Sequence, residues 1–190
     1  MKGSSSFASI RPGRVRAAAL FALLLLALAA SAAAEEVKPR RAPELPQNGW
    51  LNTPEGKPLR MEALLGKVVL IEFWTYACFN CRNVLPYVKA WHEKYAADGL
   101  VVIGVHTPEL DFERKPENVK KKVAELGITF PVVLDPDYVT WDRYRSRAWP
   151  TIYLIDPAGR IVYVALGEGD YDRTEARIRD LLKQVTRAGN

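Results

Sequence analysis

Hydrophobic residues gather in five short runs that predict the strands of a β-sheet. The run at residues 68–74 is dense in β-branched, aliphatic and aromatic side chains, which is typical of a strand buried on both faces. Four further runs predict shorter strands, at 100–105, 130–134, 151–155 and 161–166. Because the turn sequence DPAGR separates the last two runs, we expect them to form a hairpin.

Segments with helical periodicity alternate with these runs. In residues 80–97 apolar side chains recur every three or four positions, and Asp98-Gly99 ends the pattern. Pro86 lies inside this segment and predicts a kink. Further helices are expected at 116–126, 138–144 and 174–186.

The order of these elements predicts an α/β fold. Strands that alternate with helices favour parallel crossovers, whereas the late hairpin adds antiparallel strands. We therefore expect a mixed β-sheet flanked by helices on both faces, formed by residues 49–190. Residues 50–57 predict a short N-terminal hairpin, and the Pro-rich, charged segment 35–48 is interpreted as a linker.

The first 34 residues have the pattern of a secretory signal. A basic stretch is followed by an uncharged apolar run at 17–30, and small residues then precede Glu35. We expect cleavage after Ala34 and a folded domain that is periplasmic or otherwise exported and soluble. The alternative is an uncleaved anchor that holds the domain at the membrane, because residues 17–34 are near the shortest length that spans a bilayer.

The net charge of +5 is mostly a property of this N-terminal segment. Four of the 27 basic residues and none of the 22 acidic residues lie in the first 34 positions, so the rest of the chain carries 23 basic and 22 acidic residues. A nearly neutral domain is a poor electrostatic partner for phosphates. We therefore expect no nucleic-acid partner.

The chain has only two cysteines, and they form the motif Cys78-Phe79-Asn80-Cys81 between a predicted strand and a predicted helix. Unpaired amides and the positive end of the helix dipole stabilise a thiolate at such a position. The spacing lets Cys81 reach Cys78 within the first turn. This context favours a redox pair in which Cys78 attacks and Cys81 resolves.

Two other interpretations of the cysteines stay open. Both can be structural thiols, although a disulfide between them would close too small a loop to constrain the unfolded chain much. They can also bind a metal together with His92 or His106. The sequence has no glycine-rich dinucleotide fingerprint, no P-loop and no haem-attachment motif, so we expect no cofactor.

The segment EFWTYACFNC at residues 72–81, with Pro86 after it and Trp149-Pro150-Thr151 downstream, resembles the active site of thioredoxins. The region from Gly49 to Val185 is similar to exported thioredoxin-like thiol–disulfide oxidoreductases of the TlpA, ResA and DipZ type, which are redoxins. The resemblance implies a thioredoxin-like sheet with an N-terminal hairpin and a central helical insertion between the second and third strands.

The resemblance also implies roles for the residues around the motif. Cys78 corresponds to the nucleophile and Cys81 to the resolving thiol. Glu72 occupies the position of a buried acid, where a raised pKa would let the carboxyl group exchange a proton with Cys81. The other interpretation of Glu72 is a carboxylate at a polar edge of the sheet.

Four further residues are expected to contact the substrate. Trp74 and Tyr76 would wall the site, although aromatic residues here can also belong to the core. Pro150 resembles the cis-proline that lies against the disulfide of the family. Trp149 would then offer backbone atoms to an extended substrate.

Three departures from the family pattern leave the direction of electron flow open. Ala77 stands where tryptophan is frequent, Phe79-Asn80 replaces the familiar dipeptides between the cysteines, and Trp149 is unusually bulky. The dipeptide tunes the stability of the thiolate and with it the reduction potential. The resemblance favours reduction of client cysteines, as in cytochrome c maturation.

The expected partners follow from this activity. They are a client protein with a disulfide or cysteine pair and a membrane electron donor, and the domain itself is expected to be a monomer. One alternative function is a peroxiredoxin-like thiol peroxidase, because Thr75 stands three residues before Cys78, although Ile71 replaces the proline of that motif. Another is copper delivery by Cys78, Cys81 and a histidine.

Overall fold

The computed structural model describes residues 37–188 of the chain. The predicted export signal at residues 1–34 lies outside these residues. Among the helices of the described part, none is both long enough and apolar enough to cross a membrane.

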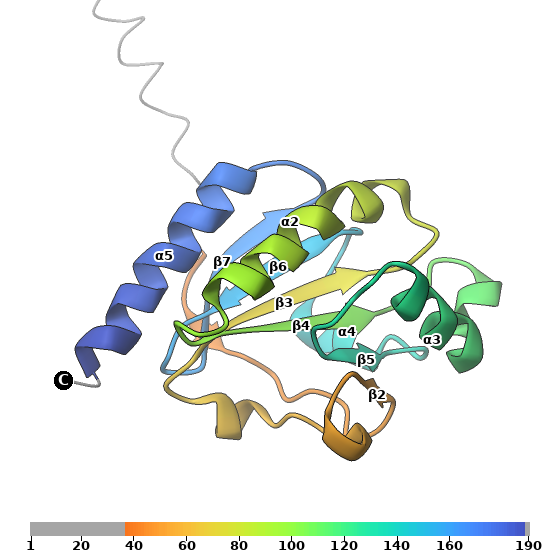
Figure 1. Ribbon diagram of the computed structural model, residues 1–190, viewed down its shortest axis with the longest axis horizontal. Helices are drawn as coiled ribbons and strands as arrows, with labels where there is room; N and C mark the ends of the chain where they lie inside the picture. Colours follow the sequence, from red (N-terminus) through yellow and green to blue (C-terminus); the bar gives the residue numbers. More distant parts are fainter. Residues whose placement is uncertain (1–36, 189–190) are drawn as a thin grey trace, which may run out of the picture. The chain divides into compact units, whose positions relative to one another are not determined.

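A seven-stranded mixed sheet runs through the centre of the domain (Figure 1). The strand order is β1-β7-β6-β3-β4-β5-β2. Strands β3, β4 and β5 are parallel to one another, whereas β6 and β7 form the predicted antiparallel hairpin beside β3. The strand bounds are β1 Arg40–Arg41, β2 Trp50–Leu51, β3 Val68–Trp74, β4 Leu100–His106, β5 Val132–Leu134, β6 Thr151–Ile155 and β7 Arg160–Leu166.

Helices cover both faces of this sheet, as the sequence predicts. Alternate residues of β3 point to opposite faces, so Leu70 packs in one hydrophobic cluster and Ile71 in another. The first cluster lies beneath α2 (Phe79–Tyr95), α3 (Pro116–Glu125) and α5 (Tyr171–Ala188), which Figure 1 shows in front of the sheet. The second includes α4 (Val139–Tyr144) and the N-terminal segment.

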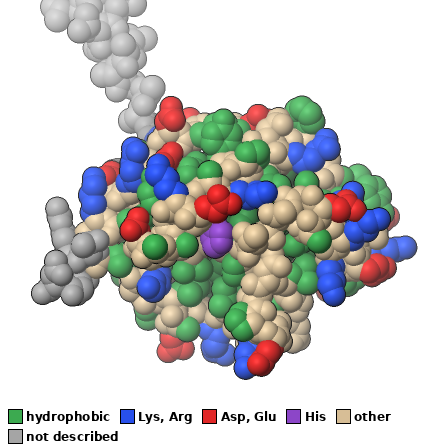
Figure 2. Space-filling view, viewed as in Figure 1, with side chains coloured by type: hydrophobic (Ala, Val, Ile, Leu, Met, Phe, Trp, Pro, Cys, Tyr) green, Lys and Arg blue, Asp and Glu red, His purple; other side chains and the backbone are tan. Residues whose placement is uncertain are grey.

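The central helical insertion is confirmed. Between β4 and β5 the chain forms a 3₁₀ turn at Asp111–Arg114 and then α3. Helix α2 continues through Pro86, which is the eighth of its 17 residues. Figure 2 shows positive and negative side chains interspersed over the face that α2 and α5 cover.

The N-terminal part of the domain differs from the sequence-based expectation. The predicted hairpin at 50–57 is wrong, because β2 pairs with β5 and residues 54–56 form a 3₁₀ turn. The expected linker also belongs partly to the domain. Its β1 pairs with β7, and Ala42 and Leu45 are buried in the second cluster.

Candidate thiol–disulfide active site

The cysteine motif lies at the amino end of α2, as predicted. Cys78 is the N-cap residue, and the backbone N–H of Cys81 donates to its sulfur at 3.3 Å. Cys78 is half-buried and the neighbouring Phe79 is 67% exposed, whereas Cys81 is only 2% exposed. Both thiols are free. One sulfur can therefore meet a partner from solvent, while the other is shielded one turn deeper.

The surroundings of Cys81 disfavour its thiolate. Burial raises the pKa of Cys81 far above the ordinary value, and the neighbouring Cys78 and Glu72 raise it further. A hydrogen bond from the backbone N–H of Thr75 acts in the opposite direction. Proton transfer from Cys81 therefore needs assistance from a nearby base.

Glu72 is buried in the middle of β3 and not at a polar edge. It is 1% exposed, and the strand alternation directs it to the same face as Leu70 and Trp74, beneath α2. Neither carboxyl oxygen has a hydrogen-bond partner. Burial raises the pKa of Glu72 to about 8. A carboxyl group with this pKa exchanges its proton near neutral pH.

The two predicted wall aromatics lie at different depths. Trp74 is 2% exposed and packs in the core, so its indole does not reach the surface as a wall residue would. Its indole lies over Gly104 of β4, where an added Cβ atom would come within 2.8 Å of the indole nitrogen. Tyr76 is half-buried, stacks on His106 with ring centroids 5.5 Å apart, and donates from its hydroxyl to the backbone of Phe112.

The Trp149–Pro150 peptide bond is cis, which confirms the conformation that the family resemblance implies. Because Thr151 pairs with Phe73, Pro150 lies beside the carboxyl end of β3, next to the loop that carries Cys78. The Trp149 indole stacks on Trp141 at 4.1 Å and donates to the backbone oxygen of Thr107. These two contacts fix the orientation of the Trp149 side chain.

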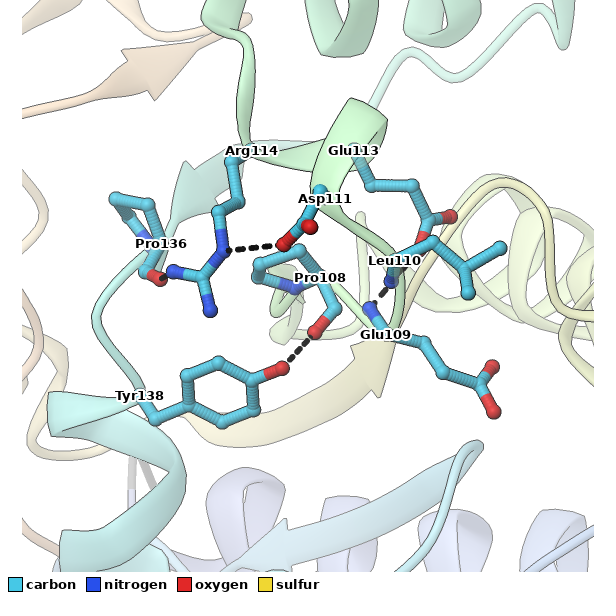
Figure 3. Close-up of polar contacts among 8 residues, drawn as sticks. All are labelled: Pro108, Glu109, Leu110, Asp111, Glu113, Arg114, Pro136 and Tyr138. Atoms are coloured by element: carbon cyan, nitrogen blue, oxygen red, sulfur yellow. Dashed lines mark hydrogen bonds and ion pairs between the residues drawn. The ribbon is translucent and has the colours of Figure 1, made fainter.

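Sequence reasoning missed Glu113, a buried residue in the turn before α3. Its carboxylate accepts a hydrogen bond from the Thr75 hydroxyl and one from the Ala77 amide at 2.9 Å. Its other oxygen accepts from the amides of Glu109 and Leu110 (Figure 3). Burial alone would raise the pKa of Glu113, but these hydrogen bonds outweigh it and lower the pKa. Nothing in the local sequence distinguishes this glutamate from the solvated acids around it.

The histidines do not join the cysteines in a metal site. Within residues 37–188 there is no group of three histidine, cysteine or acidic residues arranged to hold a metal ion. His106 is buried, which lowers its pKa to about 4, and its Nε2 lies 3.2 Å from the Thr75 hydroxyl. His92 packs edge-on against Phe130. The copper hypothesis thus has no histidine ligand in this part of the chain.

Comparisons with known proteins agree with this geometry. The chain is 52% identical over 137 residues to Protein DipZ of Mycobacterium tuberculosis, which covers 72% of this chain and 20% of DipZ. It is 30% identical over 144 residues to the thiol-disulfide oxidoreductase YkuV of Bacillus subtilis, covering 75% of this chain and 95% of YkuV. The chain thus spans only 20% of the length of its DipZ relative.

A solved structure has the same fold. The crystal structure of a thiol-disulfide isomerase from Corynebacterium glutamicum matches with a TM-score of 0.64 and 32% identity, covering 74% of this chain and 96% of that one. Residues 40–164 match the model of the AhpC/TSA family. The chain therefore belongs to the AhpC/TSA family, among its thioredoxin-like members of the thiol–disulfide oxidoreductase kind.

Proposed function

We propose that the protein is an exported thiol–disulfide oxidoreductase that reduces disulfides of client proteins through Cys78 and Cys81. The observation that carries this proposal is the asymmetry of the pair. Cys78 is half-exposed at a helix N-terminus, whereas Cys81 is buried one turn deeper with its amide on the Cys78 sulfur. An attacking thiol needs access and a stabilised thiolate, and a resolving thiol needs only its neighbour.

The reaction transfers two electrons in two exchanges. The Cys78 thiolate attacks one sulfur of the client disulfide, a bond forms between them, and the client's other sulfur leaves as a thiolate that takes a proton. Cys81 then loses its proton and attacks Cys78, which releases the second client thiolate. The client is reduced to two thiols, and the protein is left with a Cys78–Cys81 disulfide.

Glu72 is the proposed acceptor for the Cys81 proton. It is buried on the face of β3 that α2 covers, neither of its carboxyl oxygens has a hydrogen-bond partner, and its pKa is about 8. Its ionised form takes the proton during oxidation of the pair, and its neutral form returns one when the pair is reduced again. Cys81 therefore does not need a base from the solvent-exposed surface to take its proton.

The client approaches over the surface around Cys78. Phe79 of the motif and Phe112 of the insertion are exposed, and half-buried Tyr76 contacts the Phe112 ring. The Trp149–Pro150 backbone contacts the client from the other side, where the client segment is extended, as the family resemblance implies. We propose that the domain acts as a monomer on this surface.

The cellular role is a reductive one in an exported compartment, of the kind needed for cytochrome c maturation. It is supported by the predicted signal at residues 1–34 and by the likeness to exported members of the family. Electrons must come from a donor that regenerates the dithiol, and a membrane protein that carries electrons across the bilayer supplies them.

The test is turnover of insulin disulfides by the full chain with dithiothreitol as reductant. We expect activity in the native protein, none in Cys78→Ser, and a stable mixed disulfide with insulin in Cys81→Ser. Retained turnover in Cys78→Ser would overturn the proposal. Consumption of hydrogen peroxide in place of insulin reduction would support a thiol peroxidase instead.

A further inference from the structure

The connection between β4 and α3 holds the segment at residues 74–77, which leads into the cysteine motif. The Thr107 amide donates to the backbone oxygen of Trp74 at 3.1 Å. The Tyr76 hydroxyl donates to the backbone oxygen of Phe112, also at 3.1 Å. These two contacts keep the connection and the segment side by side, so that a third group on the connection can act on the motif.

Glu113 supplies the third contact, and it accepts hydrogen bonds at both carboxyl oxygens. One oxygen accepts from the Thr75 hydroxyl and, at 2.9 Å, from the Ala77 amide. The other accepts from the amides of Glu109 and Leu110, each at 2.9 Å. These charge-assisted bonds keep the carboxylate ionised despite its burial. The carboxylate therefore connects the loop on one side to the segment before the motif on the other.

The loop that carries Glu113 is itself anchored. Arg114 donates to the backbone oxygen of Pro136 at 2.5 Å, and the Tyr138 hydroxyl donates to that of Pro108 (Figure 3). Figure 3 shows the Glu113 carboxylate directed away from these anchors. The backbone of the loop is thus fixed to the segment before α4, and the carboxylate is a firm support for the groups that it binds.

Cys78 lies between this support and the first turn of α2. On its amino side, the amide of the preceding residue, Ala77, is held by Glu113. On its carboxyl side, its backbone oxygen accepts from the Arg82 amide and its sulfur accepts from the Cys81 amide, both at 3.3 Å. Both of these bonds require Cys78 to stay at the N-cap position, where the helix N-terminus stabilises a thiolate.

We propose that Glu113 is a positioning residue that holds the backbone at Ala77, keeps the Cys78 sulfur at the N-terminus of α2 and so speeds its attack on the client disulfide. This inference rests on the proposed function. A carboxylate also repels a thiolate, so a direct effect of the Glu113 charge would have the opposite sign. Resolution by Cys81 is affected much less, because the Cys78 sulfur is then part of the mixed disulfide and is not a thiolate.

The two steps can be separated with Ellman's reagent, an aromatic disulfide, added to the reduced full chain. Attack by Cys78 releases one thionitrobenzoate in a phase that depends on reagent concentration, and resolution by Cys81 releases the second in a phase that does not. In Glu113→Gln we expect the first phase to slow about tenfold, as for one lost hydrogen bond to a charged group, and the second phase to stay within about threefold.

Glu113→Asp separates position from charge. It keeps the negative charge, but its side chain is shorter by one methylene group, so it cannot reach the loop amides and the Ala77 amide together. We expect it to slow the first phase about as much as Glu113→Gln does. A native rate in Glu113→Asp, or a faster first phase in Glu113→Gln, would show that the charge matters and the position does not, and overturns the inference.

The matched control is Glu117→Gln, which makes the same change of charge at an exposed side chain of α3. It should leave both phases unchanged. If the Glu113 variants fold poorly, Thr75→Val removes the hydroxyl contact to the carboxylate and Thr75→Ser keeps it. We expect Thr75→Val to slow the first phase and Thr75→Ser to restore the native rate.

The redox equilibrium with glutathione gives a second readout. A Cys78 thiolate that loses its stabilising position makes the reduced form less stable, so at the same glutathione ratio the pair should be more oxidised in Glu113→Gln than in the native protein. A shift in the other direction, or an unchanged first phase in Glu113→Gln and Thr75→Val, overturns the inference.

A purely structural role would lower the amplitude of both phases together and leave their rates equal to those of the native protein. That outcome also overturns the inference. Failure of the proposed function is distinct: the native protein would then release only one equivalent of thionitrobenzoate or fail to turn over insulin.

Discussion

Glu72 and Cys81 form a pair of buried acids whose charges disfavour each other. The Glu72 carboxyl group contributes to the raised pKa of Cys81, and its own pKa is raised to about 8 by burial. Neither Glu72 oxygen has a hydrogen-bond partner. Near neutral pH both groups are therefore largely protonated in the reduced site, and removing the Cys81 proton is the chemical task of the resolving step.

Resolution by Cys81 should accelerate as Glu72 ionises. We expect the rate of the second phase with Ellman's reagent to rise with pH around a midpoint near 8, because only the carboxylate can accept the proton. In Glu72→Gln this rise should disappear and the rate near neutral pH should fall about tenfold or more. The same midpoint in both proteins would exclude Glu72 as the base.

The stability of the fold should decline with rising pH because of the same residue. Below pH 4.5 the Glu72 carboxyl group binds its proton in both the folded and the unfolded chain, whereas between 4.5 and about 8 only the folded chain keeps it. Unfolding then releases a proton, so the free energy of unfolding falls over this range by about 5 kcal/mol.

Urea titrations of the reduced protein at a series of pH values measure this contribution. Glu72→Gln provides the control, because it removes the titrating group while keeping the shape of the side chain. The difference in free energy of unfolding between variant and native protein should change with pH over this window. A constant difference would contradict the buried, unpaired state of Glu72.

The two thiols should differ in their reaction with iodoacetamide. Cys78 is half-buried, whereas Cys81 is 2% exposed and its pKa is strongly raised by burial. We expect Cys78 to be alkylated at least about tenfold faster, since only an accessible thiolate reacts. Mass spectrometry of peptides from the native protein measures the ratio, and Cys78→Ser reports the rate of Cys81 alone. Equal labelling of both would contradict the asymmetry on which the proposed mechanism rests.

Gly104 should not tolerate a side chain. An added Cβ atom would lie 2.8 Å from the Trp74 indole nitrogen and 3.1 Å from the Phe130 ring, so the core beneath the thiol site must shift. We expect Gly104→Ala to lower the free energy of unfolding by about 1–3 kcal/mol, as overpacking does. Denaturant melts test this, and a variant as stable as the native protein would show that Trp74 has room to move.

The sequence was sufficient for the regular part of the fold. Strands β3 and β6 are found at the predicted residues, because dense β-branched runs have few other ways to bury their side chains. The cysteine pair could also be placed, since a strand–helix junction is defined by local periodicity. The family resemblance identified Glu72 as a candidate acid. Whether it is buried could not be predicted, because that depends on which face of β3 the side chain occupies.

Long-range contacts account for what the sequence did not predict. The short strand β2 finds its partner in β5, far along the chain, and no local pattern specifies that pairing. Glu113 resembles any glutamate of a charged loop until the fold brings it to Thr75 and Ala77. In the same way, the sequence shows Trp74 only as an aromatic residue near the motif, whereas the structure shows its indole packed in the core against Gly104 of β4, where a Cβ atom would leave too little room.

The connection between β4 and α3 also contacts the cis-proline side of the site. The backbone oxygen of Thr107 accepts the Trp149 indole, and Tyr138, which binds Pro108, lies edge-on to the same indole with ring centroids 6.5 Å apart. If the whole segment between β4 and α3 were replaced, we expect thiol reactivity and client preference to change together. Engineering one property without the other therefore requires substitutions on a single side of the loop.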